Sequence, residues 1–195
     1  MHELAVARSE LILGGQRSGK SRRAELLARS WLAQSPSHEA VLIATGQPWD
    51  DEMRARIIRH QLDRAERVPG MRTLEEPLAL PEALAKCSNS RTMVVVDCLT
   101  LWLTNQLMPV ESDASKTSIR QQKHGPSAML SGAIVAADGP VILVGNEIGL
   151  GVIPMGRETR DFVDALGRLN QEVAAVCERV TLMVAGLPLT LKGSS

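Results

Sequence analysis

The sequence predicts an α/β fold in which a mostly parallel sheet is flanked by helices. Short apolar runs alternate along the whole chain with stretches whose apolar residues recur at helical spacing. Such alternation is typical of strands joined by helical crossovers, and these connections build parallel sheets. The chain shows neither an internal repeat nor a domain linker. We therefore expect a single domain that spans residues 1–195.

The composition agrees with one compact domain and argues against several classes of partner. With 195 residues, of which 44% are hydrophobic, the chain can bury a substantial core without metals or disulfides. The formal net charge of +0 creates no overall field that would attract nucleic acid or anionic lipid. Only 2% of the residues are aromatic, so platforms for stacking single-stranded bases are scarce. We expect no nucleic-acid partner, and no membrane insertion because no apolar run reaches the ~18 residues of a transmembrane helix.

Three cysteines, Cys87, Cys98 and Cys177, are widely spaced along the chain. Their odd number and spacing match neither a zinc site nor a disulfide framework, and each lies in an apolar context. We expect core thiols in a reducing compartment. The N-terminal residues carry charges where a signal peptide needs an apolar core, which also favours a cytoplasmic protein.

The strongest motif is the segment GGQRSGKS, which follows an apolar run and matches the phosphate-binding pattern G-x-x-x-x-G-K-[ST]. Its glycines let the backbone turn with the N–H groups aimed inward, Lys20 can reach the terminal phosphates, and the hydroxyl of Ser21 can bind Mg²⁺. A helix that opens here adds the positive end of its dipole. The motif therefore predicts a P-loop, RecA-like fold whose first nucleotide-binding residues are Gly14, Gly15, Gln16, Arg17, Ser18, Gly19, Lys20 and Ser21.

The remaining elements follow from the periodicity of the apolar residues. Strands are expected at 10–13, 41–45, 71–75, 93–96, 141–144 and 180–185, with an antiparallel C-terminal strand at 187–192. Helices are expected over 20–33, from residue 50 onward, over 81–87, after Asp97, and over 127–137 and 157–178. Residues 1–9 should form a loose N-terminal extension, and the polar segment 108–126 is the best candidate for a mobile loop.

The helix that begins near residue 50 carries a histidine of interest. A stripe of Met53, Ile57, Ile58 and Leu62 is expected to be buried, and His60 lies off that stripe, at the surface or over a cleft. An exposed helical histidine among arginines is usually an ordinary surface residue. An imidazole near neutral pH is also a competent nucleophile, so the residues alone leave both interpretations open.

Two acidic residues are placed where parallel strands end. Asp97 follows four apolar residues, as the acidic residue of a Walker B element does, and there it can hold Mg²⁺ directly or through water. The alternative is that Asp97 only caps the helix that follows it. Glu75 ends another predicted strand, where a loop would approach the nucleotide.

Six segments that run in order along nearly the whole chain carry a family resemblance. They are GGQRSGKS at 14–21, ATGQPWDDEM at 44–53, VVDCLTLWLTN at 95–105, NEIGLGVIP at 146–154, GRLNQEVA at 167–174 and AGLPLTLK at 185–192. Together they resemble the bifunctional adenosylcobinamide kinase/adenosylcobinamide-phosphate guanylyltransferase family. The resemblance implies that the aminopropanol hydroxyl of adenosylcobinamide is phosphorylated with ATP or GTP. GMP from GTP would then pass to adenosylcobinamide phosphate through a guanylylated histidine, with release of pyrophosphate.

The same resemblance assigns roles to particular residues. The family histidine corresponds to His60, the expected nucleophile, which acts beside Lys20 as the second catalytic residue. Mg²⁺ is expected with the nucleotide, held by Ser21 and Asp97, and the family forms homotrimers. Beyond the P-loop, the nucleotide contacts of the family fall on Ala44, Thr45, Gly46, Gln61, Leu62, Asp63, Arg64, Glu75 and Asp97.

Two rival functions come from other classes. Another P-loop small-molecule kinase would share the phosphate site but would leave no GMP adduct on the protein. A RecA-like ATPase or nucleic-acid binding module would bind DNA with strong salt dependence, and the missing basic stripe and scarce aromatics argue against it. A nucleotide sensor without catalysis would not need Lys20, Asp97 and His60 together.

Overall fold

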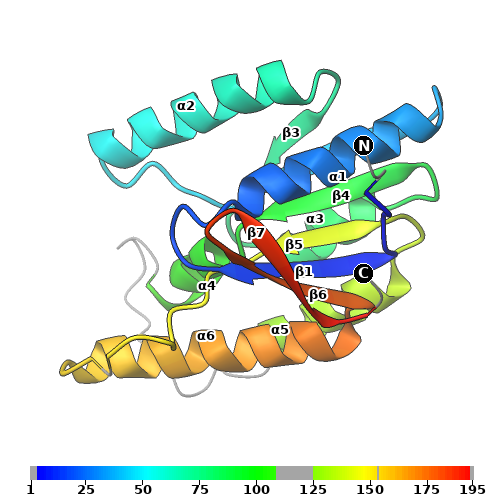
Figure 1. The fold of residues 1–195 in the computed structure, drawn as a ribbon. Coiled ribbons are helices and arrows are strands. Elements are labelled where there is room, and N and C mark those ends of the chain that lie inside the picture. The colour runs from blue at the N-terminus through cyan, green and yellow to red at the C-terminus, as the bar shows by residue number, and fades with distance from the viewer. Residues whose placement is uncertain (1–3, 109–124, 153, 194–195) are drawn as a thin grey trace.

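The computed structural model describes residues 4–108, 125–152 and 154–193. Within these ranges the strands form one seven-stranded sheet in the order β3-β2-β4-β5-β1-β6-β7 (Figure 1). Neighbouring strands are parallel except for β6 and β7, which are antiparallel. The strands are β1 (Ser9–Gly14), β2 (Glu39–Ala44), β3 (Arg72–Glu75), β4 (Thr92–Asp97), β5 (Val141–Val144), β6 (Arg179–Val184) and β7 (Leu187–Lys192). The predicted α/β class, mostly parallel sheet and antiparallel C-terminal strand are confirmed.

Helices cover both faces of this sheet. Figure 1 shows α1 and α2 on one side and α5 and α6 on the other. The helices are α1 (Lys20–Gln34), α2 (Asp51–Arg67), α3 (Leu80–Cys87), α4 (Leu99–Leu107), α5 (Gly125–Ala136) and α6 (Arg157–Val176). Within the described ranges, no helix is both long enough and apolar enough to cross a membrane.

The strands are apolar on both faces because each face has its own hydrophobic core. In β1, Leu11 and Leu13 face the core shared with α3, α4, α5 and α6, whereas Ile12 between them faces the core shared with α1. This division follows from the alternation of side chains along a strand. Continuous apolar runs such as VILV in β5 are therefore fully buried, as is usual for central parallel strands.

The sheet places the functional segments at a single edge. The P-loop follows β1, and β5 lies between β1 and β4, the strand that ends in Asp97. Because β1, β4 and β5 are parallel, the segments that follow them emerge at the same edge, as expected for ligand sites of open α/β sheets.

The prediction of a buried apolar stripe on α2 is wrong for Ile58 and Leu62, whereas Met53 and Ile57 are half-buried. Ile58 is 50% exposed and Leu62 is 68% exposed, and the inward face instead carries Gln61, Arg64 and the cap residue Val68. The helix still begins where expected, because the side chain of Asp50 accepts a hydrogen bond from the backbone N–H of Met53. Polar contacts to β3 and α1, described below, hold α2 in place of a continuous apolar face.

Two segment boundaries also differ from expectation. Ser9 belongs to β1, and residues 4–8 are held, since Leu4 and Val6 pack on the core and the N–H of Arg8 donates to Glu178 at 2.8 Å. Residues 1–3 of the expected loose extension lie outside the described residues. The predicted mobile loop at 108–126 lies mostly outside the described residues. Its last two residues, Gly125 and Pro126, begin α5.

Candidate nucleotide-binding site

The P-loop is a tight turn that only glycine permits at two positions. Gly14 has φ +151°, and a Cβ there would lie 2.5 Å from the carbonyl oxygen of Met183. Gly19, the residue before α1, has φ +101°, and a Cβ there would lie 3.3 Å from Cα of Gly186. The N–H of Gly186 also donates to the carbonyl oxygen of Ser18 at 3.0 Å. The turn between β6 and β7 therefore packs against the P-loop and stabilises it.

Polar groups converge inside this turn. The ammonium of Lys20 donates to the carbonyl oxygen of Gly15 at 2.5 Å, and the residue is buried. The hydroxyl of Ser18 is buried and has no hydrogen-bond partner among the residues that the structure describes, so it is a polar atom inside the loop that a ligand could satisfy. Gln16 and Arg17 are exposed at the tip. The N-terminus of α1, a buried ammonium and an orphaned hydroxyl together suit an anionic ligand.

The hydroxyl of Ser21 lies 3.4 Å from Oδ2 of Asp97, so the P-loop helix and the end of β4 meet. The Walker B interpretation of Asp97 requires this geometry. Within the described part of the chain, no side chain caps the start of α4, so the structure does not support the alternative that Asp97 caps it. Two of the predicted site residues, far apart in sequence, are thus brought together.

Three neighbouring strands end at the same level. Ala44 pairs with Asp97 on one side and with Glu75 on the other. Beyond Ala44, the hydroxyl of Thr45 donates to the carbonyl oxygen of Cys98 at 2.7 Å and accepts from its N–H at 2.9 Å. Thr45 is fully buried, so its side chain supports the β4–α4 turn. Gly46 follows Thr45, and a Cβ at Gly46 would lie 3.8 Å from Cδ1 of Ile57, so this part of the chain passes close to α2.

Four predicted contact residues, Gln61, Leu62, Asp63 and Arg64, lie on α2. Gln61 Nε2 donates to Glu75 Oε1 at 3.2 Å, which joins two predicted site residues. Arg64 is buried and donates to Thr73 Oγ1 at 3.2 Å, so its guanidinium faces β3. Asp63 lies 3.5 Å from Arg67, and Leu62 projects into solvent. In this arrangement Gln61 and Arg64 attach α2 to the sheet edge.

His60 is exposed on α2, and an ion pair between α2 and α1 relates its position to the start of α1. Arg67 Nη1 contacts Glu25 Oε2 on α1 at 3.2 Å, and in Figure 1 the two helices run in the same direction. His60 precedes Arg67 by seven residues on the same face, which is about 10 Å along the axis. Lys20 precedes Glu25 by five residues on α1, about 7.5 Å. His60 therefore lies on the same side of the Arg67–Glu25 ion pair as the start of α1, which follows the P-loop.

The loop after β5 presents apolar side chains at the same edge of the sheet. It joins β5 to α6, and in it Leu150 is 82% exposed and Val152 and Met155 are each 96% exposed. The N–H of Glu147, at its start, donates to the carbonyl oxygen of Gly14 at 3.1 Å. The sequence GLGVIPM at 149–155 could have indicated this surface, because its apolar residues lie in a glycine-rich segment that predicts neither a strand nor a helix.

Comparison with known families decides which P-loop protein this is. A family model described as "Cobinamide kinase / cobinamide phosphate guanyltransferase" matches residues 10–191.

The chain belongs to the cobinamide kinase / cobinamide phosphate guanyltransferase family.

Relatives and solved structures agree with this assignment. The chain is 48% identical over 185 residues to the bifunctional adenosylcobalamin biosynthesis protein CobP of Pseudomonas aeruginosa, covering 94% of this chain and 97% of the relative. It is 35% identical to CobU of Escherichia coli, covering 93% and 98%. Two solved structures share the fold alone, at 11% and 12% identity. The flagellar accessory protein FlaH of Methanocaldococcus jannaschii has a TM-score of 0.50, covering 97% of this chain and 80% of that one. A protein of Pyrococcus horikoshii OT3 has a TM-score of 0.53, covering 99% and 90%.

In this member of the cobinamide kinase / cobinamide phosphate guanyltransferase family, the residues present fit a nucleotide-bound Mg²⁺. Mg²⁺ keeps several waters and takes few protein ligands besides phosphate oxygens. The hydroxyl of Ser21 and the carboxylate of Asp97, 3.4 Å apart and half-buried, are oxygen donors of that kind. Within the part of the chain that is described, no group of three or more His, Cys, Asp or Glu side chains could form a metal site without such a substrate.

Cys98 follows Asp97 directly but is unsuited to nucleophilic catalysis. Burial, and secondarily the charge of Asp97, raises the pKa of the Cys98 thiol to about 11. Burial likewise raises the pKa of the Cys177 thiol to about 12. A thiol with so high a pKa is almost entirely protonated at neutral pH, so neither cysteine supplies a thiolate.

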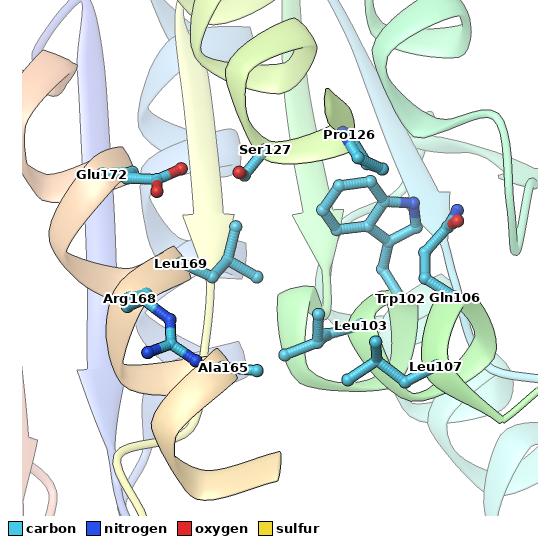
Figure 2. Close-up of a pocket in the computed structure, with 10 residues that line it drawn as sticks. All are labelled: Trp102, Leu103, Gln106, Leu107, Pro126, Ser127, Ala165, Arg168, Leu169 and Glu172. Atoms are coloured by element: carbon cyan, nitrogen blue, oxygen red, sulfur yellow. The ribbon is translucent and has the colours of Figure 1, made fainter. Parts of the chain in front are cut away.

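A recess on the other side of the sheet is separate from the P-loop. Figure 2 shows it between α4, the start of α5 and α6, with Trp102, Leu103 and Leu169 toward its interior and Arg168 and Glu172 along one wall. None of the predicted site residues lines it. The family's nucleotide contacts and this recess are therefore different places on the molecule.

Proposed function

We propose that this chain phosphorylates adenosylcobinamide and then converts the product, with GTP, to adenosylcobinamide-GDP. Family membership and matches that span 97% and 98% of two relatives support both activities. Both relatives are named bifunctional adenosylcobalamin biosynthesis proteins. The single observation that carries the site is the meeting of Ser21 and Asp97 at the mouth of an intact P-loop.

The kinase step needs one phosphate site and a hydroxyl acceptor. The backbone N–H groups of the P-loop and the ammonium of Lys20 hold the β- and γ-phosphates of ATP or GTP. The aminopropanol hydroxyl of the corrinoid attacks the γ-phosphorus, the bond from γ-phosphorus to the bridging oxygen breaks, and the nucleoside diphosphate leaves. Ser21 and Asp97 would hold Mg²⁺ with the nucleotide, and the ion would supply positive charge to the phosphate oxygens. Positioning and electrostatics supply most of the rate.

The guanylyl transfer is proposed to use His60 in two displacements. A neutral imidazole nitrogen attacks the α-phosphorus of GTP, a P–N bond forms, and pyrophosphate leaves on the P-loop side. A phosphate oxygen of the corrinoid then attacks the same phosphorus, the P–N bond breaks, and the imidazole is regenerated. The location of His60 on α2, which is ion-paired to the helix that follows the P-loop, supports this role.

The other residues of the site position these groups. Ala44, Gly46 and Glu75 lie at the edge where the nucleotide would extend, and Gln61, Leu62, Asp63 and Arg64 lie on the helix that carries His60. We also propose, from the family resemblance, that the chain forms a homotrimer, which sedimentation equilibrium would measure.

The test is to incubate the protein with α-³²P-GTP and Mg²⁺ without corrinoid, and to locate the modified residue by mass spectrometry. We expect an acid-labile GMP adduct on His60, no adduct in His60→Ala, and measurable kinase activity in that variant. Lys20→Ala should lose both steps by about 100-fold or more, since it removes a cation from both. An adduct on another residue, or equal loss of both steps in His60→Ala, would reject the histidine as nucleophile.

A further inference from the structure

Four exposed apolar side chains lie within eight positions of the β5–α6 loop. Ile148 is 41% exposed, Leu150 82%, Val152 96% and Met155 96%. We call these four residues the apolar patch. Single exposed leucines are ordinary on protein surfaces, whereas several exposed apolar side chains in one short loop are typical of a binding surface.

The loop that carries the apolar patch is anchored at its two ends. At its start, the N–H of Asn146 donates to Thr100 Oγ1 at 3.0 Å, and the Asn170 amide donates to the carbonyl oxygen of Asn146 at 3.1 Å. At its end, the guanidinium of Arg160 donates to the carbonyl oxygens of Pro154 and Met155. These bonds fix the two ends of the loop to α4 and α6, and the described apolar side chains between and beside them are exposed.

The position of the apolar patch follows from the strand order. Because β5 lies between β1 and β4, its loop leaves the sheet between the P-loop and Asp97. The N–H of Glu147 is bonded to the carbonyl oxygen of Gly14 at 3.1 Å, and Leu150 follows three residues later. Three residues span at most about 11 Å. Leu150, at the start of the apolar patch, is therefore within reach of a molecule whose hydroxyl reacts at the P-loop, and a substrate that contacts the rest of the patch must be large.

We propose that the apolar patch receives an apolar face of the corrin ring of adenosylcobinamide during both reactions. This inference rests on the proposed function and names the surface that binds its acceptor substrate. A corrin is a large macrocycle with aliphatic faces, which needs an open apolar surface more than an enclosed cavity. A purine base suits the patch less well, because none of the four side chains is aromatic.

The experiment compares Leu150→Ser, Val152→Ser and the double variant with wild type. A matched control is Val135→Ser on α5, since Val135 is 57% exposed. Val135 lies near the end of α5, which leads into the start of β5, whereas the apolar patch follows the end of β5. The first readout is KM for adenosylcobinamide in the kinase reaction at saturating nucleotide. The second is the rate at which GTP alone forms the enzyme–GMP adduct, a half-reaction that needs no corrinoid. The third is the sedimentation coefficient.

We expect the double variant to raise KM for adenosylcobinamide by about tenfold, as loss of apolar contact area predicts. Its kcat, adduct rate and sedimentation should match wild type, and Leu150→Met should restore most of the affinity. An unchanged KM in the double variant would overturn the inference. A changed sedimentation coefficient would also overturn it, by showing that the patch is covered by a second copy of the chain. If wild type forms no adduct, the proposed function fails, and that outcome is separate from either result on KM.

Discussion

Arg67 of α2 lies 3.2 Å from Glu25 of α1, and this ion pair ties the helix that carries His60 to the helix that begins at the P-loop. The carboxylate of Glu25 is almost fully buried, whereas Arg67 is half-exposed. The hydrogen bond to Glu25, and then its charge, raises the pKa of Arg67. The pair relates the two halves of the candidate site through side chains 42 residues apart.

Replacing Arg67 should therefore affect the guanylyl step more than the kinase step. In Arg67→Met we expect the enzyme–GMP adduct to form several-fold more slowly, because α2 loses its ion pair to α1. The kinase KM for nucleotide should change little. The measurement is single-turnover labelling with α-³²P-GTP.

A matched control is Arg72→Met, which removes a more exposed ion pair, to Glu39, at the outer strands. Exposed pairs contribute little, so this variant should label at the wild-type rate. If both variants label equally slowly, the Arg67–Glu25 contact has no special role in placing His60.

The P-loop turn should reject a methyl group at Gly14 but tolerate one at Gly15. Gly14 combines a positive φ with a Cβ position 2.5 Å from a backbone oxygen, whereas a Cβ at Gly15 meets nothing within 4 Å. We expect Gly14→Ala to lower the free energy of unfolding by about 2 kcal/mol or more, and Gly15→Ala to leave it nearly unchanged. Urea denaturation measures both. Equal stability of the two variants would show that the turn relaxes at Gly14.

The kinase should need more Mg²⁺ when either of the two proposed oxygen ligands beside the P-loop is removed. In Asp97→Asn and Ser21→Ala, the Mg²⁺ concentration for half-maximal kinase activity should rise about tenfold or more, because each loses an oxygen ligand. Titration of activity with Mg²⁺ at fixed nucleotide measures this. A variant at Asp138, an exposed acid in the α5–β5 turn, is the control, and Asp138→Asn should titrate like wild type.

The buried thiols should make the fold sensitive to alkaline pH. The pKa of Cys98 is raised from 9.0 to about 11, and that of Cys177 from 9.0 to about 12. The folded state therefore holds these protons more tightly than the unfolded chain. Their contribution to stability is fully present below pH 9 and is lost as the pH rises through 11 and 12.

Thiol labelling gives a direct measurement of the same property. At pH 8, iodoacetamide should modify Cys87 first, since it is only partly buried, and should leave Cys98 and Cys177 largely unmodified. Mass spectrometry identifies the modified sites. Early modification of Cys98 would show that the β4–α4 turn opens in solution.

Much of the fold could be predicted because its signals are local. Strands such as VILV and the helical spacing of Ala24, Leu27 and Ala28 report burial on a covered sheet face, and the structure buries all of them. The P-loop is equally local, since its glycines, lysine and serine are consecutive in the chain. The α2 stripe failed because apolar spacing shows which residues share a helix face, but does not show what covers that face.

The sequence by itself determined the alternation of strands and helices, the phosphate-binding turn and the family of the chain. These depend on short-range patterns and on motifs that keep their order. Only the tertiary structure decided that Asp97 meets Ser21, that Gln61 bonds Glu75, and that Arg67 holds α2 beside α1. The physical reason is that each of these contacts joins side chains from different elements, whose distance depends on strand order and helix placement.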